Sequence, residues 1–149
     1  MNIFNCKCAD ALGPYASPIL RLVTGLIFAM HGYQKLTQFG LESTTGFLAS
    51  LGFPAASVFA ALLIAAELGG GILLILGLFT HWVAKILSVV ALVALFTAHI
   101  SKGFFMATGG YEFILLILAA TISLMITGPG AFALDAKMKK SGAQTPEVQ

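Results

Sequence analysis

Five polar side chains stand inside or at the edge of long apolar runs, and their types can bind a small molecule or move a proton. They are His31, Lys35, Glu67, His99 and Glu112. Histidine and carboxyl groups take up and release protons during reactions, and lysine donates hydrogen bonds. Because ionisable groups are costly to leave facing lipid, we expect these side chains to face inward and to pair.

His31 and Lys35 are four residues apart in the segment MHGYQKL, with Gly32 between them. On a helix, residues i and i+4 lie one above the other on one face, so both side chains point the same way. Gly32 lets a neighbouring backbone or a ligand come close. Two plainer interpretations stay open: Lys35 reaches out to the lipid headgroups, and His31 bonds to a backbone carbonyl as an ordinary core histidine.

Glu67 lies near the middle of an apolar run, in the small-residue segment AAELGGG. At that depth a carboxyl group is either protonated or paired with a cation such as Lys35 or Arg21. The small residues beside it would let another helix approach closely, although they could equally serve packing alone. We therefore predict that Glu67 has a functional or bundle-organising role.

The elements that position these residues are apolar helices. The chain has 149 residues, of which 58% are hydrophobic and 9% charged, whereas soluble domains have about a quarter charged residues. Four segments approach or exceed the roughly 20 residues that cross a bilayer: about 18–36, 54–78, 81–100 and 110–127. They lack the alternation of transmembrane β-strands. The sequence predicts an all-α integral membrane protein, an antiparallel four-helix bundle forming one domain.

The lysines and arginines predict the orientation of this bundle. Six of the eight, including Arg21 and the three of the C-terminal tail, fall on or near the side of the termini, and only Lys35 and Lys102 fall on the other. The excess of positive charge places both termini in the cytoplasm. We expect flexible cytoplasmic tails at 1–17 and 137–149, and a location in the bacterial inner (cytoplasmic) membrane as a multi-pass protein.

With this orientation, His31, Lys35, His99 and Glu112 lie at the outer level of the bundle, and Glu67 lies below them. Arg21 opens the first helix and Asp135 follows the last one, so a structural ion pair between them is expected on the cytoplasmic side.

Other classes of site are not predicted. A net charge of +2 without a basic stripe gives no indication of nucleic-acid binding. Cys6 and Cys8 form a single C-x-C without partners at zinc-site spacing, so we expect free thiols and no metal site.

Five segments occur in an order that resembles the DoxX family of small four-helix membrane proteins. They are RLVTGLIFAMHGYQKL at 21–36, LGFPA at 51–55, AELGGGILLILGLFT at 66–80, GYEFILLI at 110–117 and GPGAFALD at 128–135. The resemblance covers about residues 18–136. It implies an inner-membrane bundle with a redox association, since relatives include the DoxD-type subunit of thiosulfate:quinone oxidoreductase and proteins linked to thiol or oxidative stress.

The family's recurring positions are matched residue by residue, and one position departs. The matched residues are Arg21, His31, Gly32, Lys35, Glu67, Glu112 and Asp135. Where many members of the family have an arginine after the threonine that ends the second helix, this chain has His81. A cationic contact at that end is therefore in doubt.

Together, the residues and the resemblance favour a quinone-linked redox subunit. The candidate catalytic residues are Glu67, His31 and Glu112, and the candidate cofactor-binding residues are His31, Gly32, Lys35 and His99. His31 and Lys35 would hydrogen-bond the quinone carbonyls, and Glu67 or Glu112 would relay protons. A redox partner protein or a soluble reductant would be needed.

Three alternatives stay open. The chain could be a small proton or solute carrier or channel, which would need a homo-oligomer, or a non-catalytic scaffold that recruits a redox partner. His31 and His99 share a level at which they could ligate a haem. However, two histidines in a bundle are more often structural, so haem is not the expected cofactor.

Overall fold

The computed structural model describes residues 7–135, and every regular element in that range is helical. This confirms the expected all-helical bundle. The principal helices are α1 (Lys7–Gln34), α3 (Ala56–Leu76), α4 (Thr80–Ala94) and α5 (Glu112–Thr127). Shorter elements connect them: the π-helical segments η1 (Lys35–Phe39) and η2 (Leu95–His99), the helix α2 (Gly40–Ser50), and the 3₁₀ turns η3 (Ile100–Lys102) and η4 (Met106–Thr108).

Three helical stretches of the described chain are long and apolar enough to cross a membrane, namely 12–50, 56–76 and 80–102. The fourth apolar helix, α5, has only 16 residues. At 1.5 Å per residue its length is about 24 Å. The expected set of four apolar segments is therefore present, with the last one shorter than the others.

The first helix begins earlier than the sequence predicts. The sequence predicts a flexible tail at 1–17, but α1 begins at Lys7 and contains Pro14 and Pro18. Proline lacks an N–H, so Pro18 leaves the carbonyl of Pro14 without its usual helical partner. The backbone N–H of Ala131 donates to that carbonyl over 3.3 Å, so the exposed carbonyl anchors the chain that follows α5.

Some of the sequence-based expectations lie outside the described residues. These are residues 1–6 of the predicted N-terminal tail, which include Cys6, and the C-terminal tail at 137–149. Of Cys8 the structure describes only the backbone, which lies in the first turn of α1.

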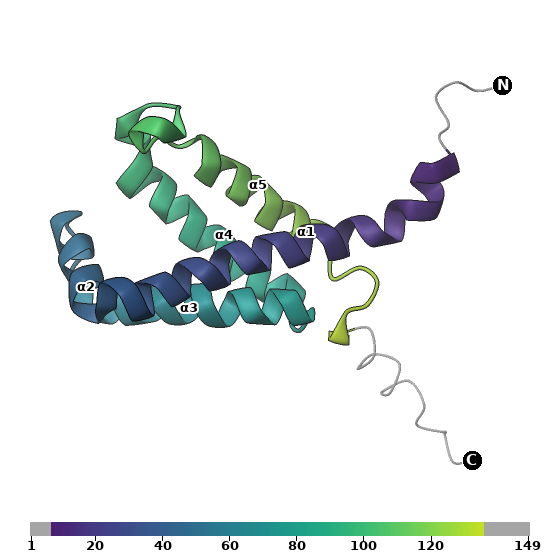
Figure 1. The fold of residues 1–149 in the computed structure, drawn as a ribbon, viewed down its shortest axis with the longest axis horizontal. Coiled ribbons are helices and arrows are strands. Elements are labelled where there is room, and N and C mark those ends of the chain that lie inside the picture. Colours follow the sequence, from purple (N-terminus) through teal and green to yellow (C-terminus); the bar gives the residue numbers. More distant parts are fainter. Residues whose placement is uncertain (1–6, 136–149) are drawn as a thin grey trace, which may run out of the picture.

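The helices form two pairs that converge near the end of the bundle where α3 passes into α4. α1 lies along α3, α5 lies along α4, and α2 folds back against α3. Figure 1 shows that α4 and α5 diverge from α1 and α3 toward the end that carries α2. The side chains that face this divergent end therefore come from both pairs of helices.

Glycines set the close contact between α1 and α3. A Cβ atom on Gly71 would collide with the backbone of Gly25 and Ala29, and a Cβ atom on Gly32 would collide with the backbone of Leu68. Small residues let helix backbones approach closely in membranes, where packing replaces the hydrophobic effect. Gly70 faces the other way, since its Cβ would meet the side chain of Leu87 on α4. The AAELGGG segment therefore packs against two helices.

The close contact gives a testable difference within one motif. Gly71→Ala should lower the free energy of unfolding by about 1–3 kcal/mol, because the added methyl group overpacks the interface between α1 and α3. Gly69→Ala is the matched control, since a Cβ there meets nothing within 4 Å. It should leave stability unchanged or raise it by up to about 1 kcal/mol through helix propensity. Equal unfolding curves for the two variants in detergent would contradict this packing.

Candidate functional site

A cavity of about 900 Å³ lies between the two pairs of helices, at their divergent end. Its wall is mostly apolar, with aromatic rings and aliphatic side chains from α2, the turn after α2, α3, α4 and α5. Among them are Phe47, Phe53, Phe59, Leu62, Val89 and Phe113. Four of the five polar residues singled out in the sequence also line it: His31, Lys35, Glu67 and His99. The structure therefore brings together residues that are up to 68 positions apart in the chain.

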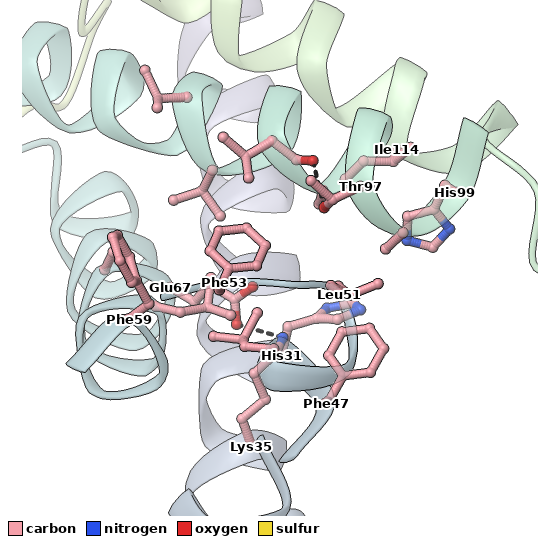
Figure 2. A pocket seen from close by; sticks show the side chains of 18 of the residues that line it. His31, Lys35, Phe47, Leu51, Phe53, Phe59, Glu67, Thr97, His99 and Ile114 are labelled. Carbon is pink, nitrogen blue, oxygen red and sulfur yellow. Dashed lines mark hydrogen bonds and ion pairs between the residues drawn. The ribbon is translucent and has the colours of Figure 1, made fainter. Parts of the chain in front are cut away.

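Lys35 and Glu67 form an ion pair at this cavity. Lys35 Nζ lies 2.6 Å from Glu67 Oε2, and the side chains are 21% and 9% exposed. Of the two states expected for Glu67, the structure shows the paired one, with Lys35 as the cation. Figure 2 shows the pair on the wall formed by α1 and α3. The side chain of Lys35 therefore turns toward the carboxylate of Glu67 and not toward the lipid headgroups.

Both histidines of the cavity are anchored through the same ring nitrogen. His31 Nδ1 lies 2.9 Å from the carbonyl oxygen of Ile27, and His99 Nδ1 lies 2.8 Å from that of Gly109. A carbonyl oxygen can only accept, so Nδ1 is the donor in both rings. The ring of His31 also stacks on Phe113 of α5, with centroids 6.4 Å apart. The backbone-bonded histidine of the plainer interpretation is present, but its ring still faces the cavity.

Two π-helical segments carry polar residues of the site. Lys35 is the first residue of η1, and His99 is the last residue of η2. A π turn holds one more residue than an α turn and rotates the side chains around it, and such turns occur frequently at functional sites. The same segment η2 places Thr97 on the cavity wall. Thr97 is not among the residues predicted from the sequence, because a threonine in an apolar helix ordinarily bonds to its own backbone.

Glu112 and Gly32, a candidate catalytic and a candidate cofactor-binding residue, are not among the residues that line the cavity. Glu112 Oε1 accepts a hydrogen bond of 2.6 Å from the backbone N–H of Met106, so it organises the loop before α5. That loop exposes backbone donors, and the carboxylate at the start of α5 satisfies one of them. Gly32 is buried against Leu68 of α3. Of its two expected uses, the approach of a neighbouring backbone is the one observed.

Arg21 and Asp135 do not form a direct ion pair among the described residues. Arg21 is buried and its Nη1 donates to the carbonyl of Pro129 over 2.8 Å. Asp135 instead accepts from the backbone N–H groups of Phe79 and Thr80, at 2.8 and 2.9 Å, at the start of α4. The unpaired N–H groups of a helix N-terminus attract a carboxylate. Both residues thus hold segment 128–135, here called the strap, against the bundle.

His81, which replaces the arginine of the family pattern, joins the same end of the molecule. Its Nδ1 donates to the carbonyl of Met125 over 2.8 Å and so ties the start of α4 to the end of α5. The position therefore makes a helix-to-helix contact without an arginine. Among the described residues, no group of three His, Cys, Asp or Glu side chains gathers closely enough to hold a metal ion.

Comparison with known proteins agrees with this architecture. The family model described as DoxX matches residues 16–100. The chain belongs to the DoxX family. The matched region of this DoxX protein includes all four of the residues that converge on the cavity, namely His31, Lys35, Glu67 and His99. The sequence resemblance is thereby confirmed.

Individual relatives match this DoxX chain over most of its length. It is 37% identical to "Putative oxidoreductase CatD" of Bacillus subtilis, over 83% of this chain and 90% of that protein. It is 33% identical to "Inner membrane protein YphA" of Escherichia coli, over 91% of this chain and 99% of that protein. No solved structure matches the chain. The chain is a membrane protein of the DoxX family.

The ion pair can be measured as a coupling between two positions. Lys35→Met and Glu67→Gln should each lower stability, and the double variant should be more stable than the sum of both losses predicts. We expect a coupling of about 1–3 kcal/mol, because contacting residues are not additive. Lys102→Met is the control, since Lys102 is exposed and should combine additively with Glu67→Gln. Additive losses for the Lys35 pair in detergent unfolding would contradict the ion pair.

The strap gives a separate prediction. Asp135→Ala should lower the free energy of unfolding by about 1–2 kcal/mol, the usual cost of losing a side-chain cap at a helix N-terminus. Glu42→Ala in the first turn of α2 is the control, since Glu42 is exposed and makes no side-chain hydrogen bond among the described residues. If both variants unfold at the same temperature, Asp135 does not stabilise α4.

Proposed function

We propose that this DoxX protein binds a lipid-soluble quinone, or its hydroquinone, in the cavity and serves as the membrane subunit of a redox system. The observation that supports this most directly is one cavity of about 900 Å³ that combines a mostly apolar wall with a few convergent polar groups. Cavities of several hundred Å³ with such a lining are typical sites for small molecules.

The residues present fit a molecule with a polar ring and an apolar tail. The aromatic rings of the wall, such as Phe47 and Phe59, and the aliphatic side chains of α3 and α4 would contact the ring face and the tail. His31, Lys35, Glu67 and His99 are the polar groups available to the ring oxygens. A molecule dissolved in the bilayer would meet this wall without crossing water.

The side chains divide into distinct roles in this proposal. Lys35 keeps N–H groups beyond the one directed at Glu67, and these can donate to a ring oxygen. Glu67 and the histidines are the groups that can hold a proton beside the ligand. Bound quinone would supply a two-electron, two-proton redox couple. A partner protein or a small reductant must exchange the electrons, and the oxidoreductase name of the Bacillus relative supports such a redox role.

The bacterial inner membrane is the proposed location, with both termini in the cytoplasm. The name of the Escherichia coli relative and the six-to-two distribution of lysine and arginine support it. The divergent end of the bundle, with the cavity, would then lie in the outer half of the membrane.

Filling the cavity should abolish ligand binding. Ala94 lines it at the end of α4, so Ala94→Phe would occupy space that the ligand needs. Decyl-benzoquinone should raise the melting temperature of the wild-type protein in detergent and leave that of Ala94→Phe unchanged. Ala119→Phe is the control, since Ala119 is exposed on α5 and outside the cavity. A wild-type protein that neither binds nor is stabilised by the quinone would contradict the proposed function.

A further inference from the structure

The hydrogen-bonding groups around the cavity are unequally divided between donors and acceptors. His31 and His99 use their Nδ1 protons on backbone carbonyls. A neutral imidazole carries one proton, so Nε2 of each neutral ring is an acceptor. Among the described residues, no group donates to either Nε2. Two acceptors thus belong to rings on the cavity wall, one from α1 and one from η2.

The neighbouring groups follow the same pattern. The hydroxyl proton of Thr97 is used on the carbonyl of Val93, at 2.8 Å, so only its lone pairs remain. The backbone N–H groups of Gly109 and Gly110 donate to the carbonyls of Met106 and Phe105, at 2.8 and 3.0 Å. These glycines line the cavity, and their donors are therefore already occupied.

Lys35 is the exception. Its ammonium group has three N–H donors, and one of them is directed at Glu67 Oε2 over 2.6 Å. A ligand with two oxygens on opposite sides of a ring can therefore find a donor for one of them. Any other polar contact around the cavity wall meets an acceptor.

From this distribution of donors and acceptors we infer that the cavity selects a lipophilic ligand whose polar head carries its own hydroxyl donors. The hydroquinone is therefore bound more tightly than the quinone. The inference rests on the proposed function and specifies the form of the ligand. A hydroquinone can donate one hydroxyl proton to each Nε2. The carbonyl oxygens of a quinone can only accept, and would place acceptor against acceptor in a mostly apolar site.

The contribution of the hydroxyl donor to binding can be measured with two stable molecules that differ only in that donor. Dissociation constants of 4-heptylphenol and its methyl ether would be measured by titration calorimetry in detergent at about pH 8.5, where ordinary imidazole is neutral. The phenol should bind about tenfold more tightly, the effect of one net hydrogen bond. Decyl-hydroquinone, kept reduced under anaerobic conditions, should likewise bind more tightly than decyl-benzoquinone.

Matched histidine variants locate the effect. His31→Phe and His99→Phe should each reduce the preference for the phenol, because the ring remains but the acceptor is lost. His81→Phe is the control, since His81 makes the same kind of Nδ1 bond but lies outside the cavity. If the cavity variants fail to fold, ¹⁵N NMR of histidine-labelled wild-type protein reads the tautomers directly. It should show the proton on Nδ1 of His31 and His99.

The outcomes separate the inference from the function on which it rests. Equal or tighter binding of the quinone and of the methyl ether overturns the inference and leaves quinone binding standing. Failure of all four molecules to bind overturns both. A proton on Nε2 of either neutral ring overturns the inference alone, as does a Soret band in the purified protein, which would show Nε2 occupied by haem iron.

Discussion

The ion pair between Lys35 and Glu67 is the constraint on which the bundle and its cavity depend. A carboxylate near the middle of a membrane helix must find a cation or lose its charge, and the cation here comes from a different helix. The pair therefore requires α1 and α3 to lie close together, which the contacts of Gly25, Gly32 and Gly71 allow. Packing and electrostatics thus favour the same arrangement of these two helices.

The opposite end of the molecule is held by different contacts. Arg21 and Asp135 bind the strap to α1 and to the start of α4. Ser17 adds a hydrogen bond from its hydroxyl group to the carbonyl of Gly128. Since these bonds join all four principal helices or their connections, the two helix pairs converge there and diverge at the cavity. The space for a ligand follows from tight attachment at one end only.

The sequence was sufficient for the helices and for part of the site. The uninterrupted apolar runs predict the helical bundle. The cost of an isolated buried charge predicts a cation beside Glu67. What it could not show were local deviations. A π turn at Lys35 has no sequence pattern of its own, and Glu112 turned to a loop donor that only the folded loop exposes. Asp135 likewise preferred free backbone N–H groups to Arg21, a choice decided by geometry.

The short length of α5 has a consequence for the surrounding lipid. A helix of 16 residues spans about 24 Å, some 6 Å less than a typical hydrocarbon core. The bilayer must become thinner beside α5, or α5 must stand upright while its neighbours tilt, and each response has an elastic cost. The total cost falls when two protein molecules lie side by side and share one deformed region of lipid. Hydrophobic mismatch along this one helix would therefore draw neighbouring molecules toward the α5 face rather than toward the longer helices.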